Sequence, residues 1–332
     1  MREENSLNKI HLISTNFNIN EYYTGGFKMR AYHKSNFILI IFIAVLIIST
    51  FNAAAEEFEN PELLISAENL KQKLEAKTDN LKLIDVRNSA KYLLGHIPGS
   101  VHMWGNDFSN PQGWVEGLIA EPRAFSALAQ KKGINNESEI VVYDDHNSTW
   151  AARVWWVFRV YGHQDIKILE GGFDAWEAKD FEENMLPFKP QAGNFEVEDV
   201  NNEWIVNTDT IAENLENEAF IILDTRTEAE YLGDETNTGA PRRGRIPNSI
   251  HIEWSQVLNE DYSLKSAAEI AEIYESQGIN KNKKVITVVS HNGVRAAHTF
   301  FTLKLLGYDN LKLYDEAWIG WSSRSDLPVQ RN

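Results

Sequence analysis

The sequence of 332 residues predicts an α/β fold of two tandem domains, each with a mainly parallel sheet flanked by helices. Two observations lead to this prediction. Short β-branched runs alternate with stretches of helical periodicity, and the second half of the chain repeats the motifs of the first. We expect strands at 82–85, 139–143, 165–169, 220–224, 284–289 and 310–314. The segments 151–161 and 296–306 place apolar residues at helical spacing. Strands that alternate with helices form parallel sheets covered on both faces.

The internal repeat sets the domain organisation. Asp85-Val86-Arg87 returns as Asp224-Thr225-Arg226, and Gly95-His96-Ile97-Pro98 returns as Gly244-Arg245-Ile246-Pro247. The offset is 139 at the aspartates and 149 at the prolines. A drifting offset with a constant order indicates duplicated domains that differ by loop insertions. We expect domains at 56–187 and 207–332, a linker at 188–206, and the largest insertion at 233–243.

The N-terminal region has the pattern of a secretory signal peptide. Residues 37–51 form an uncharged, mostly apolar run that Arg30 and Lys34 precede and Ala53-Ala54-Ala55 follow. We expect a signal peptide at 29–55, cleavage after Ala55, and export to the periplasm or the exterior. Translation from Met29 would make residues 1–28 an upstream extension. The alternative is an uncleaved anchor, although the run is shorter than the ~20 residues of a spanning helix. Only that alternative predicts contact with a membrane.

The composition restricts the partners. The net charge of −16 disfavours nucleic acid and anionic lipid surfaces. The chain contains no cysteine, so the hydrophobic cores alone must hold the domains. We expect no cofactor and no metal site, because neither HExxH nor paired CxxC spacing occurs.

A loop after the predicted strand 284–289 has the features of an anion site. Ligands of α/β sheets bind where strands end and loops lead into helices. The backbone amides of a tight loop and of the following helix start form a cradle for a small oxyanion. Gly293 permits the turn, and Arg295 adds a positive charge. The expected anion-binding loop is Ser290, His291, Asn292, Gly293, Val294 and Arg295.

These motifs resemble the two-domain rhodanese family, which includes thiosulfate and 3-mercaptopyruvate sulfurtransferases. The resemblance covers about residues 62–330. Besides the repeated motifs, it rests on matches that follow in the family's order: Trp155-Trp156, Gly171-Gly172-Phe173 with Trp176, Gly293-Val294-Arg295, His298-Thr299, and Tyr314-Asp315 with Trp318. The resemblance implies two tandem rhodanese-like domains, of which the C-terminal one carries the active-site loop.

The resemblance also implies a reaction. A loop thiolate takes sulfane sulfur from thiosulfate or 3-mercaptopyruvate, becomes a persulfide, and passes the sulfur to cyanide or to a thiol, including that of an acceptor protein. The family's catalytic cysteine falls on Ser290. The substrate neighbourhood would include Glu230, Arg243 and Arg245. Glu230 stands where some members have a substrate-binding arginine, and its alternative role is an ion pair with Arg242, Arg243 or Arg245.

The serine leaves three hypotheses. The first is a pseudoenzyme that keeps the anion-binding loop but cannot carry sulfur, because a hydroxyl forms no persulfide. The second is a hydrolase in which Ser290 is the nucleophile and His291 or His298 the base, which also needs a third, orienting group. The third is an active sulfurtransferase in which Ser290 is a sequence error or an engineered change.

The first half contains a counterpart of the loop. It reads Asp144-Asp145-His146-Asn147-Ser148-Thr149-Trp150, with two acids and no glycine. Because carboxylates repel an anion, we expect the N-terminal domain to be structural and to form one wall of an interdomain cleft.

Overall fold

A computed structural model describes residues 57–331 of the chain apart from 79, 111–114, 116 and 284. The predicted signal peptide and the upstream extension therefore lie outside the described residues. Within the part that the structure describes, no helix has the length and apolar character needed to cross a membrane.

The fold contains two five-stranded sheets in which every described pairing is parallel. The N-terminal sheet has the order β1-β5-β4-β2-β3, and the C-terminal sheet has the matching order β6-β10-β9-β7-β8. The N-terminal strands are β1 (Leu64–Ile65), β2 (Leu81–Asp85), β3 (Ser100–His102), β4 (Glu139–Tyr143) and β5 (Ile166–Leu169). The C-terminal strands are β6 (Ile205–Val206), β7 (Phe220–Asp224), β8 (Ile250–His251), β9 (Val285–Val289) and β10 (Leu311–Tyr314).

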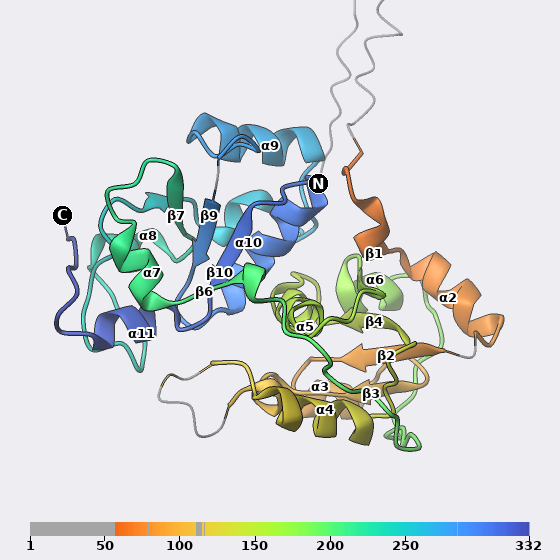
Figure 1. The fold of residues 1–332 in the computed structure, drawn as a ribbon. Helices are drawn as coiled ribbons and strands as arrows, with labels where there is room; N and C mark the ends of the chain where they lie inside the picture. The colour runs from red at the N-terminus through yellow and green to blue at the C-terminus, as the bar shows by residue number, and fades with distance from the viewer. Residues whose placement is uncertain (1–56, 79, 111–114, 116, 284, 332) are drawn as a thin grey trace, which may run out of the picture. The chain divides into compact units, whose positions relative to one another are not determined.

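The predicted fold class is confirmed, since both sheets are parallel and flanked by helices (Figure 1). The six expected strands correspond to the three central strands of each sheet. The four strands that the sequence did not reveal, β1, β3, β6 and β8, are the sheet edges and have only two or three residues each. Runs that short carry no readable periodicity. One of them, β6, takes up the last two residues of the segment expected as the linker.

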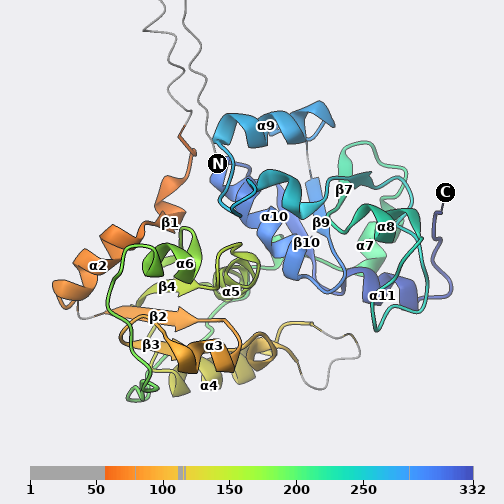
Figure 2. The ribbon, with the colours of Figure 1, turned by 180° about the vertical axis from the view of Figure 1, so that it is seen from behind.

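Helices follow the strands in the same order in both halves (Figures 1 and 2). In the N-terminal half they are α2 (Ala67–Glu75), α3 (Ser89–Leu94), α4 (Pro122–Lys131), α5 (Thr149–Val160) and α6 (Gly172–Glu177). In the C-terminal half they are α7 (Thr208–Glu213), α8 (Glu228–Leu232), α9 (Ala267–Ser276), α10 (Val294–Leu305) and α11 (Ala317–Ser323). Several begin with a side chain that caps the first turn, as Ser66 does for α2 and Asn207 for α7. Short 3₁₀ turns are η1 (Pro61–Leu63), η2 (Gly105–Phe108), η3 (Asn202–Trp204) and η4 (Trp254–Val257).

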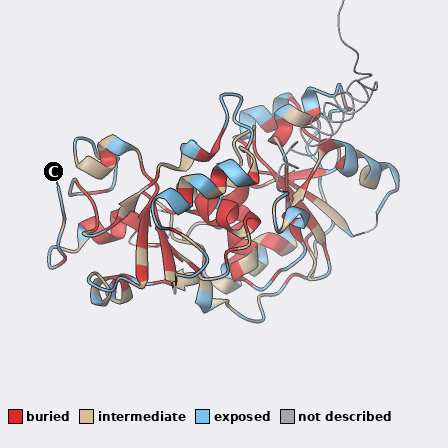
Figure 3. Cartoon of the chain, turned by 90° about the horizontal axis from the view of Figure 1, so that it is seen from above, coloured by how far each residue is buried: buried red, intermediate tan, exposed pale blue. Residues whose placement is uncertain are grey.

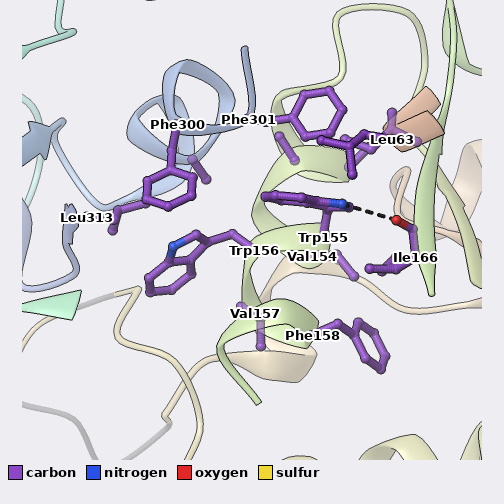
Figure 4. Close-up of a cluster of buried hydrophobic side chains, with 14 of the residues drawn as sticks. Leu63, Val154, Trp155, Trp156, Val157, Phe158, Ile166, Phe300, Phe301 and Leu313 are labelled. Carbon is purple, nitrogen blue, oxygen red and sulfur yellow. Dashed lines mark hydrogen bonds between the residues drawn. The ribbon is translucent and has the colours of Figure 1, made fainter. Parts of the chain in front are cut away.

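Helices α5 and α10 lie side by side and join the two halves (Figures 1 and 2). Both are buried over most of their length, which Figure 3 shows as red ribbon between exposed outer helices. Trp155 and Trp156 of α5 are fully buried among aromatic and aliphatic side chains (Figure 4). Trp155 donates its Nε1 proton to the Ile166 carbonyl and meets the edge of Phe301 from α10 at a centroid distance of 5.0 Å. One continuous hydrophobic core therefore contains residues of both domains.

The segment that enters each domain caps the central helix of the other. Asn60, ahead of β1, donates its amide to the Leu305 carbonyl at 3.1 Å and its side chain to the Lys304 carbonyl at 2.6 Å. Asn201, ahead of β6, donates its amide to the Val160 carbonyl at 2.7 Å. The last carbonyls of α10 and α5, which have no partner within their own helices, are satisfied in this way.

Candidate active site

Ser290 directly follows the central strand β9, and α10 begins four residues later, at Val294. Ser290 is completely buried, and its Oγ accepts the amide proton of Gly293 at 3.0 Å. Gly293 has a φ of 87°, the left-handed conformation that glycine adopts without steric cost. The helix begins at Val294, so Val294 and Arg295 lie in its first turn and not in the loop where the sequence placed them.

Helix α11 holds the loop from the other side. Trp318 donates its amide to the Ser290 carbonyl at 2.8 Å, and Ile319 donates to the His291 carbonyl at 3.3 Å. The amides of His291 and Asn292 have no acceptor among the described residues. These two amides, next to the start of α10, are the groups that could receive an anion.

The charge of Arg295 is already paired. Its guanidinium forms a two-pronged ion pair with Glu230, with Nη1 to Oε2 at 2.6 Å and Nη2 to Oε1 at 3.0 Å. Glu230 also accepts protons from the Asn237 side chain and the Thr227 amide. Burial alone would raise the pKa of Glu230, but Arg295 and the Thr227 amide outweigh it and lower this pKa to about 2. The positive charge that Arg295 brings to the first turn of α10 is therefore compensated by Glu230.

The other arginines of the predicted neighbourhood bind the chain itself. Arg242 donates to four carbonyls of the C-terminal segment: Trp321, Ser322, Arg324 and Leu327. Arg243 donates to the Asp234 carbonyl, and Arg245 lies over the Tyr231 ring at 4.5 Å. The structure brings Glu230 together with Arg295, a partner that the sequence did not suggest. Substrate contact by Glu230, Arg243 or Arg245 stays a prediction.

Neither of the two histidines considered as bases forms a hydrogen bond to the serine hydroxyl in the described structure. The Nε2 atom of His291 lies 3.0 Å from the Thr238 carbonyl, and burial lowers the pKa of its ring. His298 lies in the second turn of α10 against the Trp254 ring, and burial lowers its pKa to about 4. No hydrogen bond joins the Ser290 hydroxyl to either ring in the described structure. The described geometry therefore gives neither histidine the position of a base for Ser290.

A residue that sequence reasoning missed reaches the loop from the N-terminal domain. Arg153 of α5 donates its Nη2 protons to Asp315 at 2.5 Å and to the Gly117 carbonyl at 2.7 Å. A Cβ atom on Gly293 would lie 3.0 Å from its Nη1, which is buried without a partner among the described residues. Asp315 also accepts the Ile119 amide. The available signal was a charged residue among the apolar residues 151–158 of this helix, because buried arginines are rare unless paired.

In the N-terminal loop, a carboxylate of the chain itself accepts the backbone amides. Asp144 stands where Ser290 stands in the second domain, directly after the central strand β4. Its carboxylate accepts the amides of Ser148 at 3.0 Å, Trp150 at 3.0 Å and Ala151 at 3.2 Å. Burial raises the pKa of Asp144 to about 6, although these amides favour its charged form. The carboxylate uses the amides that an external anion would need.

The aspartates before Arg87 and Arg226 are structural in both halves. Asp224 forms a buried ion pair with Arg226, which also donates to the Gly244 carbonyl and lies 4.4 Å from the Trp318 ring centre. Asp85 and Arg87 make the same arrangement with the Gly95 carbonyl. Each pair ties the end of a strand to the glycine of a Gly-x-Ile-Pro segment that lies beyond the next helix.

Comparison with known proteins decides the family. The profile of the rhodanese-like domain matches residues 66–179 and again residues 207–324. The chain belongs to the rhodanese family. The thiosulfate sulfurtransferase of Corynebacterium glutamicum is 33% identical over 290 residues, which cover 83% of this chain and 93% of that protein. The 3-mercaptopyruvate sulfurtransferase of Escherichia coli K12 is 32% identical over 279 residues, which cover 83% of this chain and 95% of that protein.

A solved rhodanese fold agrees with these relatives. The crystal structure of SseA from Escherichia coli, a 3-mercaptopyruvate sulfotransferase, is similar with a TM-score of 0.70 and 27% identity. The match covers 77% of this chain and 98% of SseA. In the described part of this rhodanese, no group of three or more His, Asp or Glu side chains is placed to hold a metal ion.

Proposed function

We propose that this protein is an exported rhodanese-family binding protein that holds a small oxyanion or sulfur-donor ligand at the Ser290 loop and does not transfer sulfane sulfur. One observation carries the proposal. Ser290 is buried at the position of the family's nucleophile, in a chain that has no cysteine. Transfer through a persulfide requires a thiolate that attacks the donor and then holds the sulfur. A thiol has a pKa of ~8.5 that a loop of amides can lower, whereas an alcohol needs an adjacent base.

The ligand part of the proposal is supported by the groups around the loop. The amides of His291 and Asn292 are unoccupied by any described acceptor. Arg153 adds a buried guanidinium beside Gly293, with one nitrogen lacking a partner in the described structure. Because the whole chain is acidic, binding of an anion would depend on these short-range contacts.

The export part is supported by sequence. Residues 29–55 have the order of a signal peptide, with cleavage expected after Ala55. In the periplasm or outside the cell, the protein could meet a thiol-bearing acceptor protein as a partner. N-terminal sequencing of the exported chain tests the cleavage position.

The two alternatives differ in what the site must contain. A hydrolase requires a base at Ser290, and the absence of any hydrogen bond from Ser290 to His291 or His298 in the described structure favours a binding role. An active sulfurtransferase requires that Ser290 be a sequence error or an engineered change. An active-serine reagent with Ser290→Ala as control tests the hydrolase, because only a hydrolase should be labelled at Ser290.

The decisive experiment compares the mature chain with Ser290→Cys in a thiosulfate:cyanide assay. We expect no turnover by the serine form and measurable turnover by the cysteine variant, because the loop that stabilises a thiolate is retained. Ser148→Cys, which adds a thiol to the N-terminal loop, is the matched control and should stay inactive. Turnover by the serine form would disprove the loss of transfer. Calorimetry with thiosulfate and sulfate tests the ligand, and no saturable binding of either would remove the binding role.

A further inference from the structure

A cavity of about 220 Å³ lies at the loop between β4 and α5 of the N-terminal domain. This loop is the counterpart, in the first repeat, of the Ser290 loop in the second. Asn147 and Ser148 of this loop line it from the N-terminal domain, and Leu264, His298 and Phe301 line it from the C-terminal domain. It is smaller than the ~300–1,000 Å³ pockets of drug-sized ligands, so it suits a smaller compound.

The internal repeat relates this cavity to the Ser290 loop. Ser148 and Gly293 both cap their helices in the left-handed conformation, with φ values of 58° and 87°. Arg153 follows Ser148 by five positions, as His298 follows Gly293. Arg153 of α5 lies against the C-terminal loop, and His298 of α10 lies at the cavity beside the N-terminal loop. The N-terminal loop therefore has the imidazole ring of His298 beside it, whereas the Ser290 loop has the guanidinium of Arg153.

The lining combines apolar side chains with two polar side chains, His298 and Glu170, that lack a hydrogen-bond or ion-pair partner among the described residues. Leu258, Leu264 and Phe301 are among the apolar residues of the lining. His298 is 1% exposed, and neither ring nitrogen has a hydrogen-bond partner among the described residues. Glu170 is exposed at the cavity and forms no ion pair with any described side chain. A buried polar group without a partner is costly, and a ligand can remove that cost.

The charges select the sign of the ligand. Lys179 of the lining is already paired with Glu68 at 2.6 Å, and His146, which also lines the cavity, has its Nδ1 atom 2.9 Å from the Asp174 carboxylate. The carboxylate of Asp144 already accepts hydrogen bonds from three backbone amides at the N-terminal loop and the start of α5. Glu170 is left as the uncompensated charge of the lining, so an anion is repelled and a cation is attracted.

We propose that this cavity is a second ligand site, for a small ammonium compound with an apolar body and a hydroxyl or similar group. The ammonium pairs with Glu170, the body lies against Leu258, Leu264 and Phe301, and the second polar group bonds to the His298 ring. This site is independent of the chemistry at Ser290 and goes beyond the proposed function.

Calorimetry of the mature chain with tyramine tests the site, since tyramine carries an ammonium, a ring and a hydroxyl. We expect saturable binding at one site. Glu170→Gln should weaken it about fivefold, as for a lost exposed ion pair. His298→Leu should weaken it about tenfold, because the hydroxyl loses its partner. Phenethylamine, which lacks the hydroxyl, should bind the unchanged chain more weakly than tyramine does.

Controls separate this site from the Ser290 loop. Ser290→Ala should leave tyramine binding unchanged, and thiosulfate should not compete with tyramine. Because Glu170 is exposed, Glu170→Gln keeps the test valid even where His298→Leu fails to fold. The proposal is overturned by the absence of saturable tyramine binding, by equal binding to Glu170→Gln, or by equal binding of 3-(4-hydroxyphenyl)propanoate, which carries a carboxylate in place of the ammonium. Failure of thiosulfate to bind at Ser290 would leave these outcomes unaffected.

Discussion

The two strand-to-helix loops follow equivalent strands, β4 and β9, but different groups accept their backbone amides. In the N-terminal loop the Asp144 carboxylate accepts three amides of its own chain. In the C-terminal loop the Ser290 hydroxyl accepts one. A duplicated loop can thus be closed by an internal anion or left with free amides for a ligand. The first residue after the central strand decides between these outcomes.

The carboxyl groups beside the two loops differ as well. Burial raises the pKa of Asp144 to about 6, whereas the ion pair with Arg295 lowers the pKa of Glu230 to about 2 against the effect of burial. Hydrogen bonds from amides do not cancel the rise in pKa that burial causes at Asp144. At Glu230 the guanidinium of Arg295 helps to outweigh that rise.

The largest effect is expected at the contact that joins the N-terminal domain to the C-terminal loop. Arg153→Leu leaves Asp315 buried without its cation and should lower the free energy of unfolding by about 3–5 kcal/mol. Urea denaturation measures this loss. The double variant with Asp315→Leu should recover part of it, because no unpaired charge remains. A single variant as stable as the unchanged chain would show that the ion pair does not hold the loop.

The comparison of the loops predicts a smaller but unequal cost. Asp144→Ala leaves one buried and two partly buried amides without their acceptor and should lower the free energy of unfolding by about 2–3 kcal/mol. Ser290→Ala loses one acceptor and should cost about 1 kcal/mol or less. Equal costs in urea denaturation would mean that the carboxylate does not stabilise the N-terminal loop.

A further effect on stability depends on pH and has opposite signs at Glu230 and Asp144. The pKa of Glu230 is lowered from 4.5 to about 2, so its stabilisation is complete above pH 4.5 and is lost as pH falls towards 2. Glu230→Gln should therefore be about 1–2 kcal/mol less stable at pH 7, and the difference should shrink near pH 2. The pKa of Asp144 is raised from 3.8 to about 6, so the folded state takes up the proton first and this group adds stability as pH falls from 6 to 3.8.

Urea denaturation from pH 2 to pH 7 separates the two carboxyls, because each variant should remove only its own slope. Asp144→Asn should abolish the gain between pH 6 and 3.8 and leave the loss below pH 4.5. A pH profile of Glu230→Gln identical to that of the unchanged chain would contradict the ion pair with Arg295.

The central strands, the repeat and the position of Ser290 could all be read from sequence, because each depends on local periodicity or on a motif. The pairing of Arg295 with Glu230 could not, since 65 positions separate them and nearer arginines were available. Arg153 and Asp315 are 162 positions apart and belong to different domains. Such contacts follow from the packing of α5 against α10, and no local pattern encodes that packing. The edge strands were missed because two or three residues give no period.

The hydrogen bonds of Asn60 set a limit on how far the N-terminus can be shortened. Cleavage after Ala55 would leave Asn60 on the chain, so that the end of α10 keeps its cap. A protease that removed five further residues would take this cap away from α10, whose other end follows the Ser290 loop. Processing at one end of the polypeptide is thereby linked to the stability of a helix near the other.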